Sequence, residues 1–133
     1  MNQIMAIWLD GNLSAHHFVD PQYWKQNQGA VQAAMQQATV YVAEDERCIR
    51  GFAGLQENYL AGIFVSADVQ GQGIGGRLVT QLQHDYSELS LAVYEQNPAA
   101  IRFYLSHNFQ TIKQQIDEAT QQPELVMQWR QER

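Results

Sequence analysis

The sequence has one cysteine, few basic residues and no long apolar run, and each shortage excludes a class of protein. Cys48 alone cannot form an intrachain disulfide or a cysteine-built zinc site. The formal net charge of −6 argues against a nucleic-acid partner, because such proteins usually carry a basic face. No run approaches the ~20 apolar residues of a membrane helix, so no membrane partner is expected. Residues 1–10 lack the features of a signal peptide, and we therefore expect a cytoplasmic protein.

What is present favours one folded domain. The chain has 133 residues, of which 45% are hydrophobic, enough to form a core in a domain spanning residues 1–133. The four histidines occur as an adjacent pair, His16 and His17, and as the isolated His84 and His107. This spacing does not place two ligands on one helix face, and we expect no metal.

Hydrophobic periodicity and turn signals predict an α/β domain in the order β-α-α-β-β-β-α-β-α-β-β. Asp20-Pro21 and Asn97-Pro98 each read as an N-cap followed by the first residue of a helix. The expected strands cover residues 4–8, 40–44, 48–55, 59–65, 89–93, 109–117 and 125–130, and the expected helices begin near residues 13, 22, 74 and 98, the second running to residue 37.

A glycine-dense loop after residue 65 is the feature with the clearest chemistry. Gly71, Gly73, Gly75 and Gly76 let backbone N–H groups approach a ligand closely, and an amphipathic helix follows at once. Together they predict an anion site that holds phosphates. The loop is not a Walker A motif, because Arg77 and the next residue replace the required Lys and hydroxyl residue.

Two phosphate ligands remain. The glycines at 71, 73 and 76 fit the dinucleotide fingerprint, and Glu95 stands at the distance expected of the ribose-binding acid. However, residues 66–70 separate the loop from its strand, and the chain after Glu95 is too short to complete a dinucleotide-binding sheet. A dinucleotide-binding enzyme is therefore the weaker alternative.

The other ligand is coenzyme A, because Gln70-Gly71-Gln72-Gly73-Ile74-Gly75 resembles the Gln/Arg-x-x-Gly-x-Gly/Ala motif of the GNAT N-acetyltransferase superfamily. Residues 63–65, 89–93 and 97–109 are similar to that family's segments as well. The resemblance implies a mixed, mostly antiparallel sheet of about six or seven strands. It also implies about four helices and a splayed central pair of parallel strands. The Asn108 that replaces the usual Gly tolerates the same left-handed conformation.

The resemblance also implies roles for individual residues. Acetyl-CoA would be the acetyl donor, and Tyr104 matches the family's general acid, which protonates the leaving thiolate. Asn97 caps a helix and would also reach the coenzyme. Backbone groups near Ile63, Phe64 and Val65 would hold the pantetheine arm and the oxyanion, and those of Gln70, Gly71, Gln72, Gly73, Ile74 and Gly75 would hold the pyrophosphate.

The acceptor implied is a primary amine of a protein lysine, an N-terminus or a small molecule, attacked directly without a covalent enzyme intermediate. The general base stays open between Glu57 and Glu95, because residues 59–65 contain no carboxylate. The acceptor pocket is expected near His17, Phe18, Tyr23 and Trp24, whose aromatic rings could equally be core, and at residues 118–123. A non-catalytic acyl-CoA sensor remains the alternative from another class.

Overall fold

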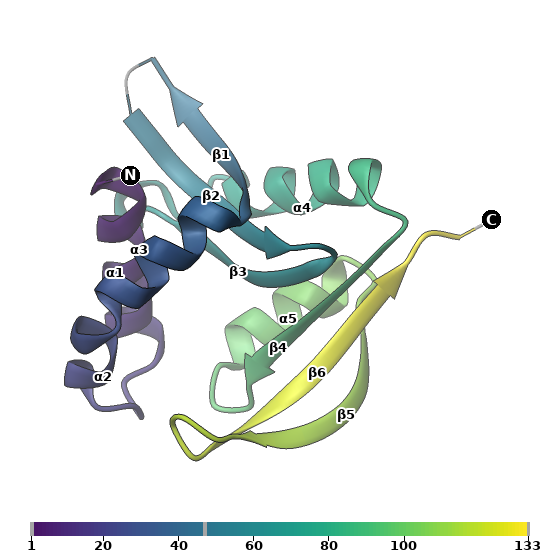
Figure 1. Cartoon of the computed structure of the whole chain (residues 1–133). Helices are drawn as coiled ribbons and strands as arrows, with labels where there is room; N and C mark the ends of the chain where they lie inside the picture. Colours follow the sequence, from purple (N-terminus) through teal and green to yellow (C-terminus); the bar gives the residue numbers. More distant parts are fainter. Residues whose placement is uncertain (1, 47, 133) are drawn as a thin grey trace.

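A computed structural model describes residues 2–46 and 48–132 as five α-helices, a 3₁₀ turn and six strands (Figure 1). In chain order they are α1 (Asn2–Ala15), α2 (Pro21–Gln26), α3 (Gln28–Gln37), β1 (Thr39–Asp45), β2 (Cys48–Gln56), β3 (Tyr59–Val65), η1 (Ala67–Val69), α4 (Ile74–Asp85), β4 (Glu88–Tyr94), α5 (Pro98–Ser106), β5 (Gln110–Asp117) and β6 (Gln122–Arg130). Within these described ranges, no helix is long and apolar enough to cross a membrane.

The six strands form one sheet in the order β1-β2-β3-β4-β6-β5, and only the β3–β4 pair is parallel. β3 and β4 are in register at a single position, where Tyr59 lies opposite Ser90 and the Ser90 N–H donates to the Asn58 carbonyl at 3.1 Å. Beyond this point the two strands separate. The structure therefore confirms the predicted mixed sheet with a splayed parallel pair in its centre.

A β-bulge in β3 sets the direction of the side chains along the gap. Gly54 of β2 pairs with Gly62, but the next residue pairs with Leu60, so Ala61 is an extra residue on β3. After the bulge, Ile63 packs on one face of the sheet and Phe64 on the other.

The two faces of the sheet carry separate hydrophobic cores. Alternate residues of β2 show the division, since Phe52 belongs to one core and Ala53 and Leu55 to the other. The core of Ala53 contains buried side chains of α4 and α5, among them Val79, Leu82 and Tyr104. The core of Phe52 is formed with the three N-terminal helices, which gather beside β1 to β3 in Figure 1. Two layers of helices therefore enclose the sheet and the gap between β3 and β4.

The strand predicted for residues 4–8 is wrong, because these residues form the first half of α1. The alternation of Ile4, Ala6 and Trp8 suggested a strand, but Met5 and Ile7 are buried while Ala6 is exposed. Buried residues at positions 4, 7 and 8 follow the helical period instead. The sheet consequently has six strands in the described residues instead of seven. The separate helix expected to begin near residue 13 is also wrong, because residues 13–15 are the end of the same helix α1.

The helix predicted from residue 22 to residue 37 is two helices. Asn27 ends α2 and begins α3, and its side-chain amide donates to the Tyr23 carbonyl at 2.6 Å. The Asn27 backbone N–H also donates to the Tyr23 and Trp24 carbonyls, at 3.2 and 3.3 Å, so backbone and side chain of Asn27 together cap the end of α2. The break therefore lies at a cap formed by Asn27.

A chain of hydrogen bonds joins α1 to α5 across the open end of the gap. The Asn97 side-chain oxygen accepts from the Ala100 N–H at 3.3 Å, which turns its amide toward His16 Nε2 at 3.2 Å. The His16 Nε2 must then be the acceptor, so Nδ1 carries the hydrogen and donates to Asn12 Oδ1 at 2.9 Å. Asn12, only 3% exposed, donates to the Trp8 carbonyl at 2.9 Å. The network thus holds His16 as one neutral tautomer.

Gly62→Ala should destabilise the protein by about 1–3 kcal/mol, as overpacking does in other cores. A Cβ there would lie 2.6 Å from Phe64 Cε2, and the Phe64 ring is already stacked on Phe52 with centroids 5.3 Å apart. Urea unfolding measures the loss. Gly54→Ala is the matched control, because Gly54 is the register partner of Gly62 and a Cβ at Gly54 meets nothing within 4 Å. Equal stabilities for the two variants would contradict this account of the packing.

The free energy of unfolding should fall as the pH drops from about 6.5 to about 4, and His16 should supply part of that fall. Burial lowers the pKa of His16 from 6.5 to about 4, so the unfolded chain binds more protons between these values. Chemical denaturation of His16→Gln across this range should show a shallower loss than the wild type. His17→Gln, the same change at the exposed neighbouring residue, should keep the wild-type slope. Parallel curves for His16→Gln and the wild type would contradict the assignment.

Candidate active site

Two cavities meet in the gap between β3 and β4. The first, of about 480 Å³, lies between the glycine loop and α5 and is called the loop cavity. The second, of about 350 Å³, lies among α1, β3, β4 and β6 and is called the front cavity. Their shared wall consists of Ile63, Val65, Gln70, Ala100 and Tyr104. A ligand in the loop cavity can therefore present its end to the front cavity.

The loop cavity has the backbone geometry of an anion site. Gly71 and Gly73 have φ values of +84° and +82°, and Gly73 is the N-cap of α4. The first N–H groups of α4 have no partner within the helix and carry its partial positive charge. Arg77 does not line the cavity, but its guanidinium lies beside the loop and donates to the Gln72 and Gly73 carbonyls at 3.4 Å. Sequence analysis named Arg77 only as a departure from the Walker A motif and did not place it beside this cavity.

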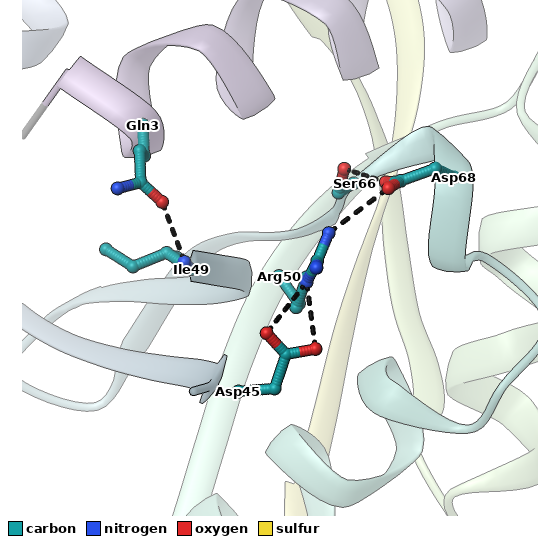
Figure 2. Close-up of polar contacts among 6 residues, drawn as sticks. All are labelled: Gln3, Asp45, Ile49, Arg50, Ser66 and Asp68. Carbon is teal, nitrogen blue, oxygen red and sulfur yellow. Dashed lines mark hydrogen bonds and ion pairs between the residues drawn. The ribbon is translucent and has the colours of Figure 1, made fainter. Parts of the chain in front are cut away.

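Side-chain contacts tie the start of the loop to the rest of the sheet. Figure 2 shows Arg50 of β2 between Asp45 and Asp68, with its nitrogens 3.0 and 3.1 Å from their carboxylates. Ser66 donates to Asp68, and this bond is the main cause that lowers the pKa of Asp68. On the far side of η1, the Gln70 amide donates to the Val65 carbonyl at 3.2 Å. The loop thus leaves the sheet along a fixed path.

Most of the predicted cofactor residues line the loop cavity. Ile63, Val65, Gln70, Gly71, Gly73, Ile74 and Gly75 do so, whereas Gln72 lines neither cavity. Phe64 and Asn97 line the front cavity instead. Asn97 caps α5 as predicted, and its amide is bonded to His16. Five of the six residues 70–75 thus line the loop cavity, and Asn97 lines the front cavity.

Tyr104 lies at the junction of the two cavities. It comes from α5, is 8% exposed, and packs in T-shaped geometry against Phe103 and Phe109 with ring centroids 5.3 and 5.4 Å away. Burial is the main cause that raises the pKa of Tyr104, and the nearby Tyr59 adds to it. The phenol is therefore protonated at neutral pH and can donate a proton to a group in either cavity.

The front cavity has aromatic walls and one carboxylate. Trp8, Trp24, Phe64 and Tyr94 supply the rings, and Glu124 of β6 is the one acidic residue among the described residues that line it. Glu57 and Glu95, the two acids considered from the sequence, line neither this cavity nor the loop cavity.

The predicted acceptor aromatics are only partly brought to the front cavity. Trp24 lines it, but His17, Phe18 and Tyr23 do not, and His16 contributes instead. The loop at residues 118–123 reaches the cavity indirectly, because the Tyr94 hydroxyl bonds to Asp117 and Thr120 at 2.7 and 3.4 Å. Glu124 and His16 were missed because their positions depend on strand register and on α1, which local patterns do not reveal.

Comparison with known proteins agrees with this geometry. A family model described as "Acetyltransferase (GNAT) domain" matches residues 36–111. The peptidyl-lysine N-acetyltransferase YiaC of Escherichia coli K12 is 30% identical over 128 residues, which cover 95% of this chain and 88% of that protein.

Solved structures show the same fold. The solution structure of apo-form YjaB from Escherichia coli has a TM-score of 0.83 at 28% identity and covers 96% of this chain and 88% of that chain. A putative streptothricin acetyltransferase from Bacillus anthracis, solved in complex with acetyl coenzyme A, has a TM-score of 0.64 at 20% identity, over 71% of this chain and 64% of that chain. The family model covers more than half of the residues, and with the loop and the splayed strands it leads to one conclusion: the chain belongs to the GNAT family of acetyltransferases.

Proposed function

We propose that this enzyme transfers the acetyl group of acetyl-CoA to the side-chain amine of lysine in proteins or peptides. The observation that carries the proposal is the junction of the two cavities at Tyr104, which gives a donor and an acceptor separate entrances and one meeting point. The 30% identity to a peptidyl-lysine N-acetyltransferase supports lysine as the acceptor class.

Acetyl-CoA would occupy the loop cavity. Backbone N–H groups of residues 70–75 would hold the pyrophosphate, with Arg77 adding positive charge from outside. The pantetheine arm would run along β3 at Ile63, Phe64 and Val65, whose edge toward β4 has no strand partner. A backbone N–H on this edge would hold the oxyanion. Asn97, with one amide hydrogen directed to His16, retains a second for the coenzyme.

The chemistry is a direct attack of a neutral amine on the thioester. The C–N bond forms as the carbonyl becomes an oxyanion, and collapse of this intermediate breaks the C–S bond. The attacking nitrogen loses one proton to solvent, the leaving thiolate takes a proton from the Tyr104 hydroxyl, and Tyr104 regains one from solvent. The aromatic walls of the front cavity suit the alkyl stem of a lysine side chain, since such stems pack on apolar surface.

A peptide with one lysine and a blocked N-terminus tests the function. The wild type with acetyl-CoA should release free thiol in step with acetylation of that lysine, followed by mass spectrometry. The same peptide with norleucine in place of lysine should give no release. Cofactor binding in a thermal-shift assay without thiol release from any amine would contradict the proposal and favour an acyl-CoA sensor.

Tyr104→Phe should lower kcat about 10²–10⁴-fold, the usual range for loss of a general acid. The KM for acetyl-CoA should change little, because the ring that packs against Phe103 and Phe109 is retained. Steady-state kinetics with the lysine peptide separates the two effects. Tyr86→Phe, a half-buried tyrosine that lines neither cavity, is the control and should keep wild-type turnover. Normal turnover by Tyr104→Phe would contradict the assignment.

A further inference from the structure

Glu124 is placed by the sheet at the acceptor end of the front cavity. It lies in β6 opposite Tyr94 of β4 and Gln115 of β5, and its side chain is half-buried. It lines the cavity together with Tyr59, Tyr94 and Tyr104. Glu124 and Tyr104 therefore border the same cavity.

The Glu124 carboxylate is incompletely bonded. Its Oε1 accepts from the Gln115 amide at 2.7 Å, and no bond to Oε2 occurs among the described residues. The lining of the front cavity, within that same part of the chain, includes no lysine or arginine. A carboxylate partly removed from water favours a cation or a hydrogen-bond donor. The cavity therefore offers an unused oxygen to a positively charged ligand.

Neighbouring acids are engaged elsewhere. Asp117 Oδ2 accepts from the Tyr94 and Thr120 hydroxyls at 2.7 and 3.0 Å, and its Oδ1 accepts from the Ala119 N–H at 3.1 Å. Glu95 accepts from the Gln114 amide at 2.7 Å, outside the cavity. Glu57 lines a separate hollow beside Gln37 and Thr39. Glu124 is thus the acid best placed to meet a ligand.

The charge of Glu124 also reaches the hydroxyl groups on the cavity wall. Burial is the main cause that raises the pKa of Tyr59, and the carboxylate of Glu124 is the next. Tyr59 in turn raises the pKa of Tyr104, after burial. These couplings place Glu124, Tyr59 and Tyr104 within one electrostatic environment.

We propose that Glu124 binds the ammonium group of the acceptor and removes a proton from it, so that a neutral amine attacks the thioester. This inference rests on the proposed acetyl transfer. One N–H bond of the ammonium breaks, the proton passes to the Glu124 carboxylate, and the freed lone pair forms the C–N bond. The second proton leaves the nitrogen as the intermediate collapses, and solvent takes both protons in the end.

The consequence is a preference for strongly basic alkyl amines. A lysine side chain has a pKa of about 10.4 and is almost fully protonated at neutral pH, whereas a peptide α-amine has a pKa of about 8. Removal of a proton therefore matters far more for lysine. With Glu124 as the base, the enzyme would acetylate lysine near pH 7. A site without a base would react only with the small fraction of lysine side chains that is neutral at that pH.

Glu124→Gln tests this, because it keeps the size of the side chain and a partner for Gln115. With a lysine peptide blocked at its N-terminus, kcat/KM at pH 7 should fall about 10²–10⁴-fold. The remaining activity should rise about tenfold per pH unit up to about pH 10, whereas the wild type should vary less. A lysine-free peptide with a free α-amine, assayed at pH 8, should lose much less. Binding of acetyl-CoA, followed by thermal shift, should be unchanged.

Glu95→Gln is the matched control and should keep the wild-type pH profile, because Glu95 lies outside both cavities. An active wild type with an unchanged Glu124→Gln profile would overturn this inference alone. Equal losses at every pH and with both peptides would also overturn it, since they indicate a structural role. A wild type that acetylates no amine would overturn the proposed function and this inference together.

Discussion

The separation of β3 from β4 is the constraint on which the rest of the site depends. These strands share one register position, at Tyr59 and Ser90, although β4 pairs with β6 along its whole length. The bulge at Ala61 turns β3 just beyond that position. The gap leaves backbone groups of β3 free for a ligand and connects the loop cavity with the front cavity. Without this gap, continuous pairing of β3 with β4 would separate the loop cavity from the front cavity.

Helix α1 is joined to the rest of the site by polar side-chain contacts as well as by apolar packing. Asn12 is buried in the last turn of this helix, where an unpaired amide would be costly, and both its side-chain oxygen and its side-chain nitrogen have a partner. His16 then reaches Asn97, the N-cap of α5, and packs in T-shaped geometry against Tyr94 with ring centroids 4.9 Å apart. Helix α1, β4 and the start of α5 are thus held in one arrangement through a neutral imidazole.

The features predictable from sequence were those fixed by neighbouring residues. The glycines of the loop and the Asn97-Pro98 cap need only local backbone chemistry, and they led to the correct fold. Residues 4–8 misled because apolar side chains at every second position, Ile4, Ala6 and Trp8, also occur in a short helical segment, where Ala6 is exposed and Met5 and Ile7 are buried. The place of Glu124 depends on the pairing of β6 with β4 and β5, which no pattern within the strand specifies.

The gap also gives this sheet four strand edges where an ordinary open sheet has two. The outer edges belong to β1 and β5, and the inner edges belong to β3 and β4. Unpaired edges are templates for aggregation, because a strand of another chain can add to them. Here α1 and α5 lie beside the inner edges. The front cavity between them is lined in part by small residues such as Ala61, Ala92 and Ala100. The helices that line the front cavity thereby also shield the inner edges from strands of other chains.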